Sequence, residues 1–289
     1  MRPAAAGFVE GMDRVLINGR PGHCISPLDR GLHFGDGLFE TIACRKGRPR
    51  LLSLHLERLV LGCRRLGIRM SDPDELRRQV QALAQDSDAS IVKLIVTRGP
   101  APGRGYAPAA AGEATHVAIR YPWPEEDPDA ARNGVRVRIA GLRLSENPLL
   151  AGMKHTNRLE QVLARSEWQD PQIAEALLFS QSGRLVSGIM SNVFIVRNGQ
   201  LRTPRIDRCG VAGVMRRVVM REAARAGIDV RECTIRAAEL EQAEEVFLTN
   251  ARIGIWPVRV LGERTLAPGP LTRRLQGLME PLLEEPVDA

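Results

Sequence analysis

The stretch "LLAGMKHTNRLEQVL", residues 149–163, decides how this chain is best interpreted. It contains Lys154, one of only three lysines among the 41 lysines and arginines of the chain. Arginine stays protonated, so it cannot act as a nucleophilic amine or carry a proton. A lysine can do both once burial or a nearby cation lowers its pKa. A lysine kept in such an arginine-rich chain therefore indicates an amine that reacts with a carbonyl group.

The other two lysines have ordinary settings. Lys46 lies in a polar hairpin turn, and Lys93 alternates within "IVKLIV", where the exposed face of a strand is expected. Lys154 lies in a glycine-containing loop directly before a helical pattern. On spacing alone, a solvated loop lysine is its simplest interpretation, so the rest of the chain has to supply the argument.

Length and composition favour a globular protein with two modest domains. The chain has 289 residues, 44% of them apolar, and no apolar run near the roughly 20 residues of a membrane span. Its N-terminus has no sustained apolar segment, so no signal peptide is expected. The five cysteines are odd in number and scattered, which argues against disulfides or a metal site and favours the cytoplasm.

The net charge of +7 raises the question of nucleic-acid binding. However, the arginines are spread along the whole chain, and aromatic residues make up only 4%. Neither a basic tail nor an aromatic-rich binding segment is visible. We therefore expect neither a nucleic-acid nor a membrane partner, but a pocket for a small anionic molecule.

Strands and helices are expected along the whole chain. Turn dipeptides predict hairpins at Asn18-Gly19, Lys46-Gly47, Ser182-Gly183 and Asn198-Gly199. An amphipathic helix is expected over 53–67, with Ser53 as its cap. Further helices are expected over 72–85, 157–168, 212–227, 236–243 and after Pro270, and Asn157 with Glu160 resembles a capping box. Strands account for most of the remaining apolar segments.

Two irregular segments stand out. Residues 99–114, "GPAPGRGYAPAAAGEA", form a long loop of the kind that is usually functional or disordered. Residues 122–130, "PWPEEDPDA", are the best linker candidate. We therefore expect a smaller N-terminal domain over 1–121 and a larger, cofactor-binding C-terminal domain over 131–289. Both should be α/β (α+β) domains whose sheets are rich in antiparallel hairpins and carry flanking helices, without regular βαβ alternation.

Several segments of the second half suit a phosphate. Gly213, Val214 and Met215 open a helix, where free backbone N–H groups and the helix dipole favour an anion. Thr249 and Asn250 end a strand and offer further hydrogen-bonding groups. Each signal is weak alone. Together with a single available lysine they point to a cofactor that carries both an aldehyde and a phosphate.

At this point the sequence resembles the class IV aminotransferases, pyridoxal-phosphate enzymes of fold type IV, from about residue 14 to 285. Within that family, "GRGY" and "KHTNRLEQ" look like the lyases that act on 4-amino-4-deoxychorismate. The other segments that carry the resemblance are "DRGLHFGDGLFETI", "LSLHLERL" and "SNVFIVRNGQLRTPRIDRCGVAGVMRR". No single motif decides it. The order and spacing of all of them along the chain do.

The resemblance implies a set of site residues. Lys154 is the lysine that forms the Schiff base with pyridoxal 5'-phosphate, and it is also the catalytic residue. The cofactor-binding residues are Lys154, Arg58, Ser187, Val214, Met215 and Asn250. The expected substrate-binding residues are Arg104, Tyr106, His33 and Glu40. Alternatives stay open from the residues alone: a solvated helix face for Arg58, a mobile surface loop for Arg104 and Tyr106, and a packed histidine for His33.

Ser187 departs from the family pattern. The family places a glutamate there, which keeps the pyridine nitrogen of the cofactor protonated. A serine hydroxyl offers only a neutral hydrogen bond, so the ring withdraws electrons less strongly. This disfavours transamination more than elimination, because elimination from aminodeoxychorismate creates an aromatic ring.

The resemblance thus implies a lyase that converts 4-amino-4-deoxychorismate to 4-aminobenzoate and pyruvate in folate synthesis, as a cytoplasmic homodimer. One alternative is a branched-chain or D-amino-acid aminotransferase on the same fold. A second is a binding or regulatory protein that has lost catalysis, for which Ser187 is the only support.

Overall fold

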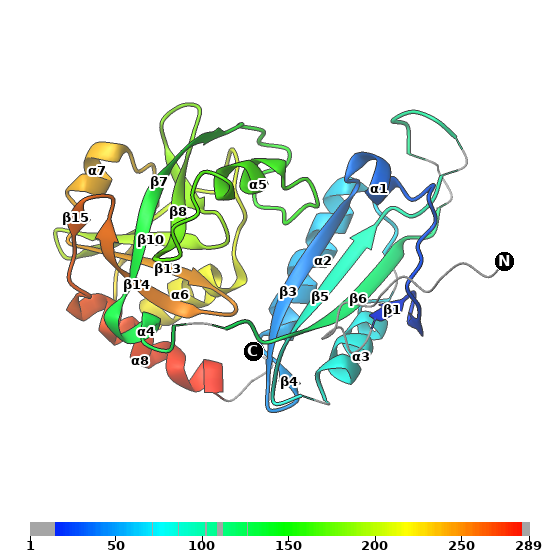
Figure 1. Cartoon of the computed structure of the whole chain (residues 1–289), viewed down its shortest axis with the longest axis horizontal. Helices are drawn as coiled ribbons and strands as arrows, with labels where there is room; N and C mark the ends of the chain where they lie inside the picture. Colours follow the sequence, from blue (N-terminus) through cyan, green and yellow to red (C-terminus); the bar gives the residue numbers. More distant parts are fainter. Residues whose placement is uncertain are drawn as a thin grey trace. The chain divides into compact units, whose positions relative to one another are not determined.

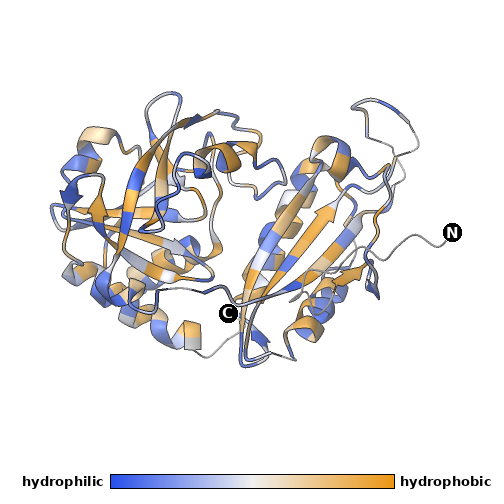
Figure 2. Cartoon of the chain, viewed as in Figure 1, coloured by the Kyte–Doolittle hydropathy of each residue, from blue (hydrophilic) through white to orange (hydrophobic). Residues whose placement is uncertain are grey.

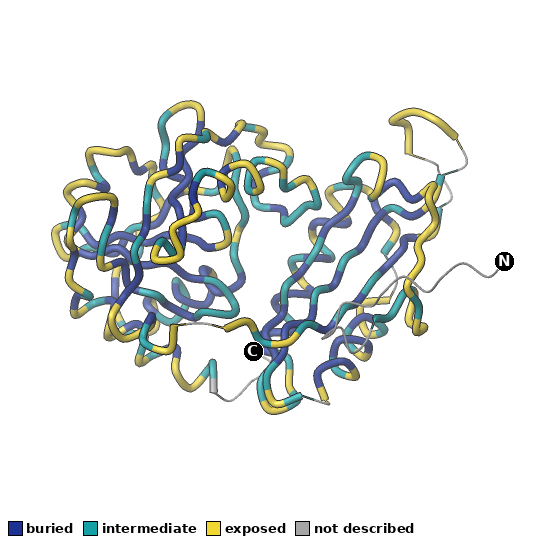
Figure 3. Tube along the Cα trace, in the orientation of Figure 1, coloured by how far each residue is buried: buried dark blue, intermediate teal, exposed yellow. Residues whose placement is uncertain are grey.

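A computed structural model describes residues 15–70, 72–85, 87–101, 103–108, 112–125 and 127–284. The chain divides into two compact units, the first ending at Pro124 and the second starting at Glu125. This division lies inside the 122–130 segment. Each unit has its own sheet, and the central strands of both sheets are mainly hydrophobic and buried (Figures 1, 2 and 3).

The first unit is an antiparallel sheet with two helices on it. Its strand order is β2-β1-β6-β5-β3-β4, and every neighbouring pair is antiparallel. Helices α2 (Leu52–Leu66) and α3 (Pro73–Ala84) contact each other and pack on the sheet (Figure 1). The strands are β1 (Val15–Ile17), β2 (Arg20–Pro21), β3 (Gly37–Arg45), β4 (Arg48–Pro49), β5 (Ala89–Thr97) and β6 (Thr115–Pro122), and the short helix α1 (Arg30–Phe34) precedes β3.

The expected hairpin turns of this unit are confirmed. Asn18, Gly19, Lys46 and Gly47 all have positive φ, the conformation that a two-residue hairpin turn needs. Gly67 ends α2 with a φ of 64°, as expected. The predicted cap is wrong, because α2 begins after Leu51 without a side-chain cap.

The second unit contains a nine-stranded mixed sheet in the order β12-β11-β10-β13-β14-β7-β8-β9, with β15 paired to β14. Its strands are β7 (Val135–Leu144), β8 (Ile173–Ser180), β9 (Leu185–Gly188), β10 (Asn192–Arg197), β11 (Gln200–Pro204), β12 (Val230–Cys233), β13 (Glu245–Asn250), β14 (Gly254–Leu261) and β15 (Arg264–Thr265). Its helices are α4 (Ala130–Asn133), α5 (Leu159–Arg165), α6 (Val214–Arg225), α7 (Ala237–Glu241) and α8 (Pro270–Glu284).

This sheet is buried on both faces. On β8, Leu177 and Phe179 belong to one hydrophobic cluster, while Ala176 and Leu178 belong to another. Successive side chains of a strand point to opposite faces, so the sheet separates two cores. Since both faces are covered, the strands read as continuous apolar runs and not as alternating ones.

The expected antiparallel hairpins are present in this unit as the β8-β9 and β10-β11 pairs. Beside them, β7 pairs in parallel with both β8 and β14, and β11 with β12. The sequence did not predict strand β14, which forms a further antiparallel pair with β13. The capping box at Asn157 does not form: α5 begins after Arg158, and the Glu160 carboxylate instead accepts a hydrogen bond from Ser145 N at 2.7 Å.

None of the helices in the described ranges combines the length and hydrophobicity that a membrane crossing requires.

Candidate active site

Lys154 lies in the second unit, in the segment between a turn at residues 149–151 and α5. Its side chain is half-buried, so it is not the fully solvated loop lysine that spacing alone allowed. Next to it, burial and the charge of Arg158 lower the pKa of His155 to about 4, so this imidazole is neutral at pH 7. The lysine is therefore in a partly desolvated place beside an uncharged histidine.

The backbone fixes this segment beside the start of α6. Gly152 forms a parallel bridge with Val211. Its N–H donates to Gly210 O at 3.0 Å, and its carbonyl accepts from Ala212 N at 3.1 Å. One residue lies between Gly152 and Lys154, and one lies between Ala212 and Val214. The structure thus brings the lysine and the helix start together through main-chain hydrogen bonds.

The N-terminus of α6 offers backbone N–H donors that suit an anion. Val214 and Met215 occupy its first turn, where backbone N–H groups have no partner within the helix. The preceding residue, Gly213, provides no side-chain cap. A Cβ on Gly213 would lie 2.0 Å from Oδ1 of Asn192, so glycine is what the close approach of these segments permits. Asn192 in turn donates from Nδ2 to Val211 O at 2.9 Å.

An amine beside an uncapped helix N-terminus fits a molecule with both a carbonyl and a phosphate group. The other donors here are backbone and amide groups, which suit an anion and not a cation. Among the described residues, no group of three histidines, cysteines or acids could hold a metal ion. Pyridoxal phosphate therefore fits this donor set.

Ser187 lies on β9, opposite Leu178 of β8, and is 8% exposed. Its hydroxyl donates to Gly188 O at 2.7 Å.

Glu175 was missed by sequence reasoning. It lies on β8, is 4% exposed, and accepts hydrogen bonds at 3.0 Å from Ile189 N, Met190 N and Ser191 Oγ. Burial raises its pKa, although these hydrogen bonds oppose the shift. The sequence signal for Glu175 was its position as a single acid inside the apolar strand "IAEALLFS". A carboxylate that is buried in such a strand needs hydrogen-bond partners. Glu175 holds the loop that follows Ser187, and it is already satisfied there.

Asn250 ends β13 and shapes the turn to β14. Its Oδ1 accepts from Arg252 N at 2.9 Å and Ile253 N at 3.0 Å, and its Nδ2 donates to Met190 O at 3.2 Å. The side chain is thus engaged in the turn and in the 188–191 loop. Its contact with Met190 connects the end of β13 to the loop that follows Ser187.

Arg58 and Glu40 lie together in the first unit. Arg58, on α2, donates from Nε to Oε1 of Glu40 at 2.8 Å and from Nη2 to Oε2. Nδ1 of His55 lies 2.6 Å from the same Oε2. Glu40 is 1% exposed, and the Arg58 side chain is only 15% exposed, so a solvated helix face is wrong for Arg58.

The neighbours of Glu40 keep its carboxylate ionised. Burial alone would raise the pKa of Glu40, but the charge of Arg58 and the hydrogen bond from His55 outweigh it and hold the pKa at about 2. Glu40 is therefore ionised and enclosed, and it orients Arg58; its burial argues against the expected contact with a substrate. His55 was not expected in the site, and its position between two buried leucines was the available signal.

The remaining expected substrate residues are at the surface of the first unit. Arg104 and His33 are exposed, and Tyr106 is 84% exposed. The ring of Phe34 lies between two of them, 5.8 Å from the His33 ring and 5.3 Å from the Tyr106 ring. His33 is not a packed core histidine, since its Nε2 lies 2.6 Å from Pro27 O in an exposed position.

Comparison with known proteins places this geometry in a family. Residues 37–261 match the model of amino-transferase class IV. The chain is 31% identical to the aminodeoxychorismate lyase of Vibrio harveyi over 265 residues, which cover 90% of this chain and 97% of that protein. It is 30% identical to a D-alanine aminotransferase of Bacillus licheniformis over 279 residues, covering 92% and 96% of the two chains.

Among solved structures, it is similar to the crystal structure of 4-amino-4-deoxychorismate lyase from Pseudomonas aeruginosa. The sequence identity is 45%, the TM-score is 0.90, and the match covers 94% of this chain and 100% of that one. The fold type IV expectation is thereby confirmed. The chain belongs to the class IV aminotransferase family.

Proposed function

We propose that this protein is a pyridoxal-phosphate-dependent lyase that converts 4-amino-4-deoxychorismate to 4-aminobenzoate and pyruvate, a step of folate synthesis. The observation that carries the proposal is the main-chain junction of Gly152 with residues 210–212, which sets Lys154 beside the uncapped start of α6. The similarity to the lyases of Vibrio harveyi and Pseudomonas aeruginosa supports the choice of substrate.

In this proposal the second unit holds most of the cofactor. Val214 and Met215 bind its phosphate through their N–H groups, and the α6 dipole favours the negative charge. The family resemblance assigns Arg58 to the phosphate as well, and within its own unit its guanidinium is oriented by Glu40. Asn250 supports this arrangement by fixing the turn after β13 and the loop beside Ser187.

Lys154 carries out the proton transfers. Its amine would hold the cofactor through the aldehyde group. The same amine, once free, would act as the general base that takes the proton from the carbon bearing the substrate amine. When bound, pyridoxal phosphate supplies an electron-withdrawing ring to that carbon. Lys154 or a bound hydroxyl then supplies a proton as enolpyruvate leaves, and the product ring becomes aromatic.

Substrate recognition falls to the exposed residues of the first unit. The substrate carries carboxylates, which a guanidinium binds through two parallel hydrogen bonds. Arg104 is the first candidate, with Tyr106 as a hydrogen-bonding neighbour and His33 beyond the Phe34 ring.

Ser187 distinguishes this reaction from transamination. A neutral hydroxyl leaves the pyridine nitrogen largely unprotonated, so the ring stabilises a carbanion less well. Elimination tolerates this because aromatisation drives it. The proposal therefore assigns a good elimination rate and a poor transamination rate to the same enzyme.

We also propose a homodimer that works in the cytoplasm. Helix α5 exposes three large apolar side chains, Leu159, Val162 and Leu163, which are 76%, 61% and 59% exposed. Such a patch on one short helix is what a second copy of the chain would cover. All five cysteines are free, as is usual in a reducing compartment.

The test is 4-aminobenzoate formation from chorismate, coupled to a synthase that makes the substrate. We expect product with the wild type and none with Lys154→Ala. Borohydride reduction of the loaded enzyme, followed by peptide mapping, should label Lys154, with Lys46 and Lys93 as internal controls. A label on Lys93, or amino-acid transamination without 4-aminobenzoate, would contradict the proposal.

A further inference from the structure

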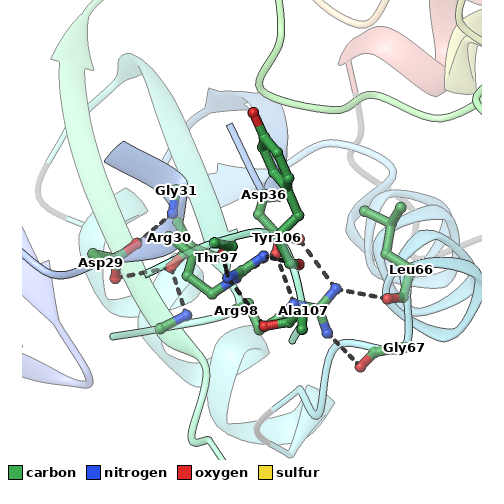
Figure 4. A network of polar contacts seen from close by, with 12 residues as sticks. Asp29, Arg30, Gly31, Asp36, Leu66, Gly67, Thr97, Arg98, Tyr106 and Ala107 are labelled. Atoms are coloured by element: carbon green, nitrogen blue, oxygen red, sulfur yellow. Dashed lines mark hydrogen bonds and ion pairs between the residues drawn. The ribbon is translucent and has the colours of Figure 1, made fainter. Parts of the chain in front are cut away.

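One arginine of the first unit binds the segment that carries the expected substrate residues. Arg30 donates from Nη1 to Gly105 O at 3.1 Å, from Nη2 to Tyr106 O at 2.8 Å, and more weakly from Nη1 to Ala107 O at 3.5 Å. A single guanidinium thus engages three consecutive carbonyl groups, 75 or more residues away in the chain (Figure 4). Segment 105–107 is therefore anchored, although its side chains are exposed.

Arg30 itself is held firmly. Its side chain is 7% exposed, and its Nε lies 2.9 Å from Oδ2 of Asp36. Its guanidinium lies over the Phe34 ring, 4.8 Å from the centroid, and the same ring contacts Tyr106. A buried ion pair and a ring contact leave the guanidinium little freedom, so its remaining N–H groups point in fixed directions.

The support under Arg30 is equally rigid. Asp29 is fully buried and caps α1, accepting from Gly31 N at 2.8 Å and from the Thr97 hydroxyl at 3.0 Å. A Cβ on Gly31 would lie 2.2 Å from Cγ2 of Thr97, so α1 is packed directly on the end of β5. The anchor of the segment is thus part of the sheet and not of another loop.

Asp36 is shared with a second arginine. Arg98 donates from Nε to Oδ2 at 2.7 Å and from Nη2 to Oδ1 at 3.1 Å. Arg98 also donates to Leu66 O and Gly67 O at the end of α2, both at 2.8 Å. Arg30 and Arg98 therefore share one carboxylate but serve different parts of the unit (Figure 4).

From this geometry we infer that Arg30 is a positioning residue for substrate binding: it fixes the backbone of segment 105–107 and so presents Arg104 and Tyr106 to the substrate carboxylates. The inference rests on the substrate role proposed for these two residues. Arg30 does not touch the reacting atoms, so its effect falls on substrate affinity and on the discrimination of carboxylates. Lysine cannot replace it, because a single ammonium cannot reach Asp36 and three carbonyl groups at once.

The experiment compares Arg30→Lys with its matched control Arg98→Lys. Both variants keep a positive charge beside Asp36, and both lose a guanidinium fork, but only Arg30→Lys loses the bonds to segment 105–107. The chain has two tyrosines, Tyr106 and Tyr121. Tyr121→Phe with 3-fluorotyrosine incorporation therefore leaves one fluorine reporter, on the segment itself.

We expect Arg30→Lys to move the fluorine resonance of Tyr106 toward the position of an unfolded peptide, while Arg98→Lys leaves it near the wild-type position. For the reaction, Arg30→Lys should raise KM for 4-amino-4-deoxychorismate about tenfold and change kcat about twofold or less, the pattern of lost binding common to ground and transition states. Cofactor absorbance should be the same in all three proteins.

Two results would overturn the inference. One is an unchanged Tyr106 resonance in Arg30→Lys, or an equal change in Arg98→Lys, since the anchoring would then not belong to Arg30. The other is a loosened segment with unchanged KM. Failure of the proposed function has a different signature: the wild type itself would form no 4-aminobenzoate, while the fluorine comparison would still test the anchor.

Discussion

At the scale of single residues, mutation can separate the cofactor binding proposed for Arg58 from the contribution of the Arg58–Glu40 ion pair to the stability of the fold. Arg58→Ala should weaken cofactor binding by about 1.5–3 kcal/mol, the range for hydrogen bonds to charged groups. It should also destabilise the fold by about 3–5 kcal/mol, because it removes the guanidinium partner of a buried carboxylate. Cofactor titration and urea unfolding measure the two effects.

The double variant Glu40→Gln/Arg58→Ala is the control. Neutralising Glu40 should restore much of the stability but none of the cofactor affinity. Cofactor affinity that is unchanged in the single variant would show that Arg58 serves only the fold.

The same carboxylate predicts a pH dependence. Its pKa of about 2 lies below the usual 4.5, so the folded state binds its proton less readily than the unfolded state. The stability it contributes is complete above pH 4.5 and is lost as the pH falls toward 2. The shift corresponds to on the order of 3 kcal/mol. Urea unfolding at pH 7, 4.5 and 3.5 should show a steeper acid loss for the wild type than for Glu40→Gln, and parallel curves would argue against the buried ion pair.

Ser187 gives a prediction about reaction type. Ser187→Glu should raise half-transamination of alanine or a branched-chain amino acid, because an ionised carboxylate keeps the ring nitrogen protonated. The lyase rate should change less, since aromatisation already assists that step. Ser187→Ala is the control and should not gain transamination. If nitrogen NMR of labelled cofactor shows no change in ring protonation in the glutamate variant, Ser187 does not face the ring nitrogen.

At the scale of elements, the start of α6 depends on its glycine. Gly213→Ala would place a Cβ 2.0 Å from Oδ1 of the buried Asn192, and such overpacking costs about 1–3 kcal/mol. Because the shift falls at the proposed phosphate site, cofactor affinity should fall about tenfold or more, or about 1.4 kcal/mol. Cofactor titration by absorbance checks this.

Gly277→Ala is the matched change in another helix. Nothing lies within 4 Å of its added Cβ, so it should leave cofactor affinity unchanged and stabilise α8 by up to about 1 kcal/mol. Equal effects of the two variants would mean that α6 has no special role.

Elements governed by neighbouring residues were predictable from the sequence. The turns at Asn18, Lys46 and Asn198 follow from dipeptides that tolerate positive φ, and the structure has all three. Elements governed by distant partners were not. Glu160 bonds Ser145 and not its own helix start, and Pro257 inside β14 masked a strand. The parallel pairing of β7 depends on crossovers that no local pattern records.

The candidate site shows the same division. Lys154, Arg58 and the α6 start were indicated by residue type and by resemblance. Glu175 and Arg30 were not, because their role is visible only once β8 meets the 188–191 loop and α1 meets segment 105–107. The sequence can indicate that such a charged residue is buried, but it cannot predict which distant groups will pair with it.

At the scale of the whole molecule, the exposed face of α5 predicts association. Light scattering at micromolar concentration should give a dimer of about 64 kDa, twice the 31.8 kDa of the chain. Replacing Leu159 and Leu163 with glutamate should raise the dissociation constant at least about tenfold, because each buried leucine contributes about 1.5–3 kcal/mol. Analytical ultracentrifugation measures the shift.

Leu61→Glu is a control on another exposed leucine, on α2 of the first unit. It should leave the dimer intact. A wild-type monomer that retains activity would remove the case for a homodimer.

The junction between Gly152 and residues 210–212 also sets the length of the ligand that the site can hold. Two main-chain hydrogen bonds fix how far the backbone next to Lys154 lies from the proposed phosphate site. A ligand that needs both ends must therefore have the matching length between its carbonyl carbon and its phosphorus. Shorter sugar phosphates or longer phosphorylated aldehydes would reach one end and miss the other. Selectivity among the cell's many phosphorylated carbonyl compounds would then come from a distance set by the main chain.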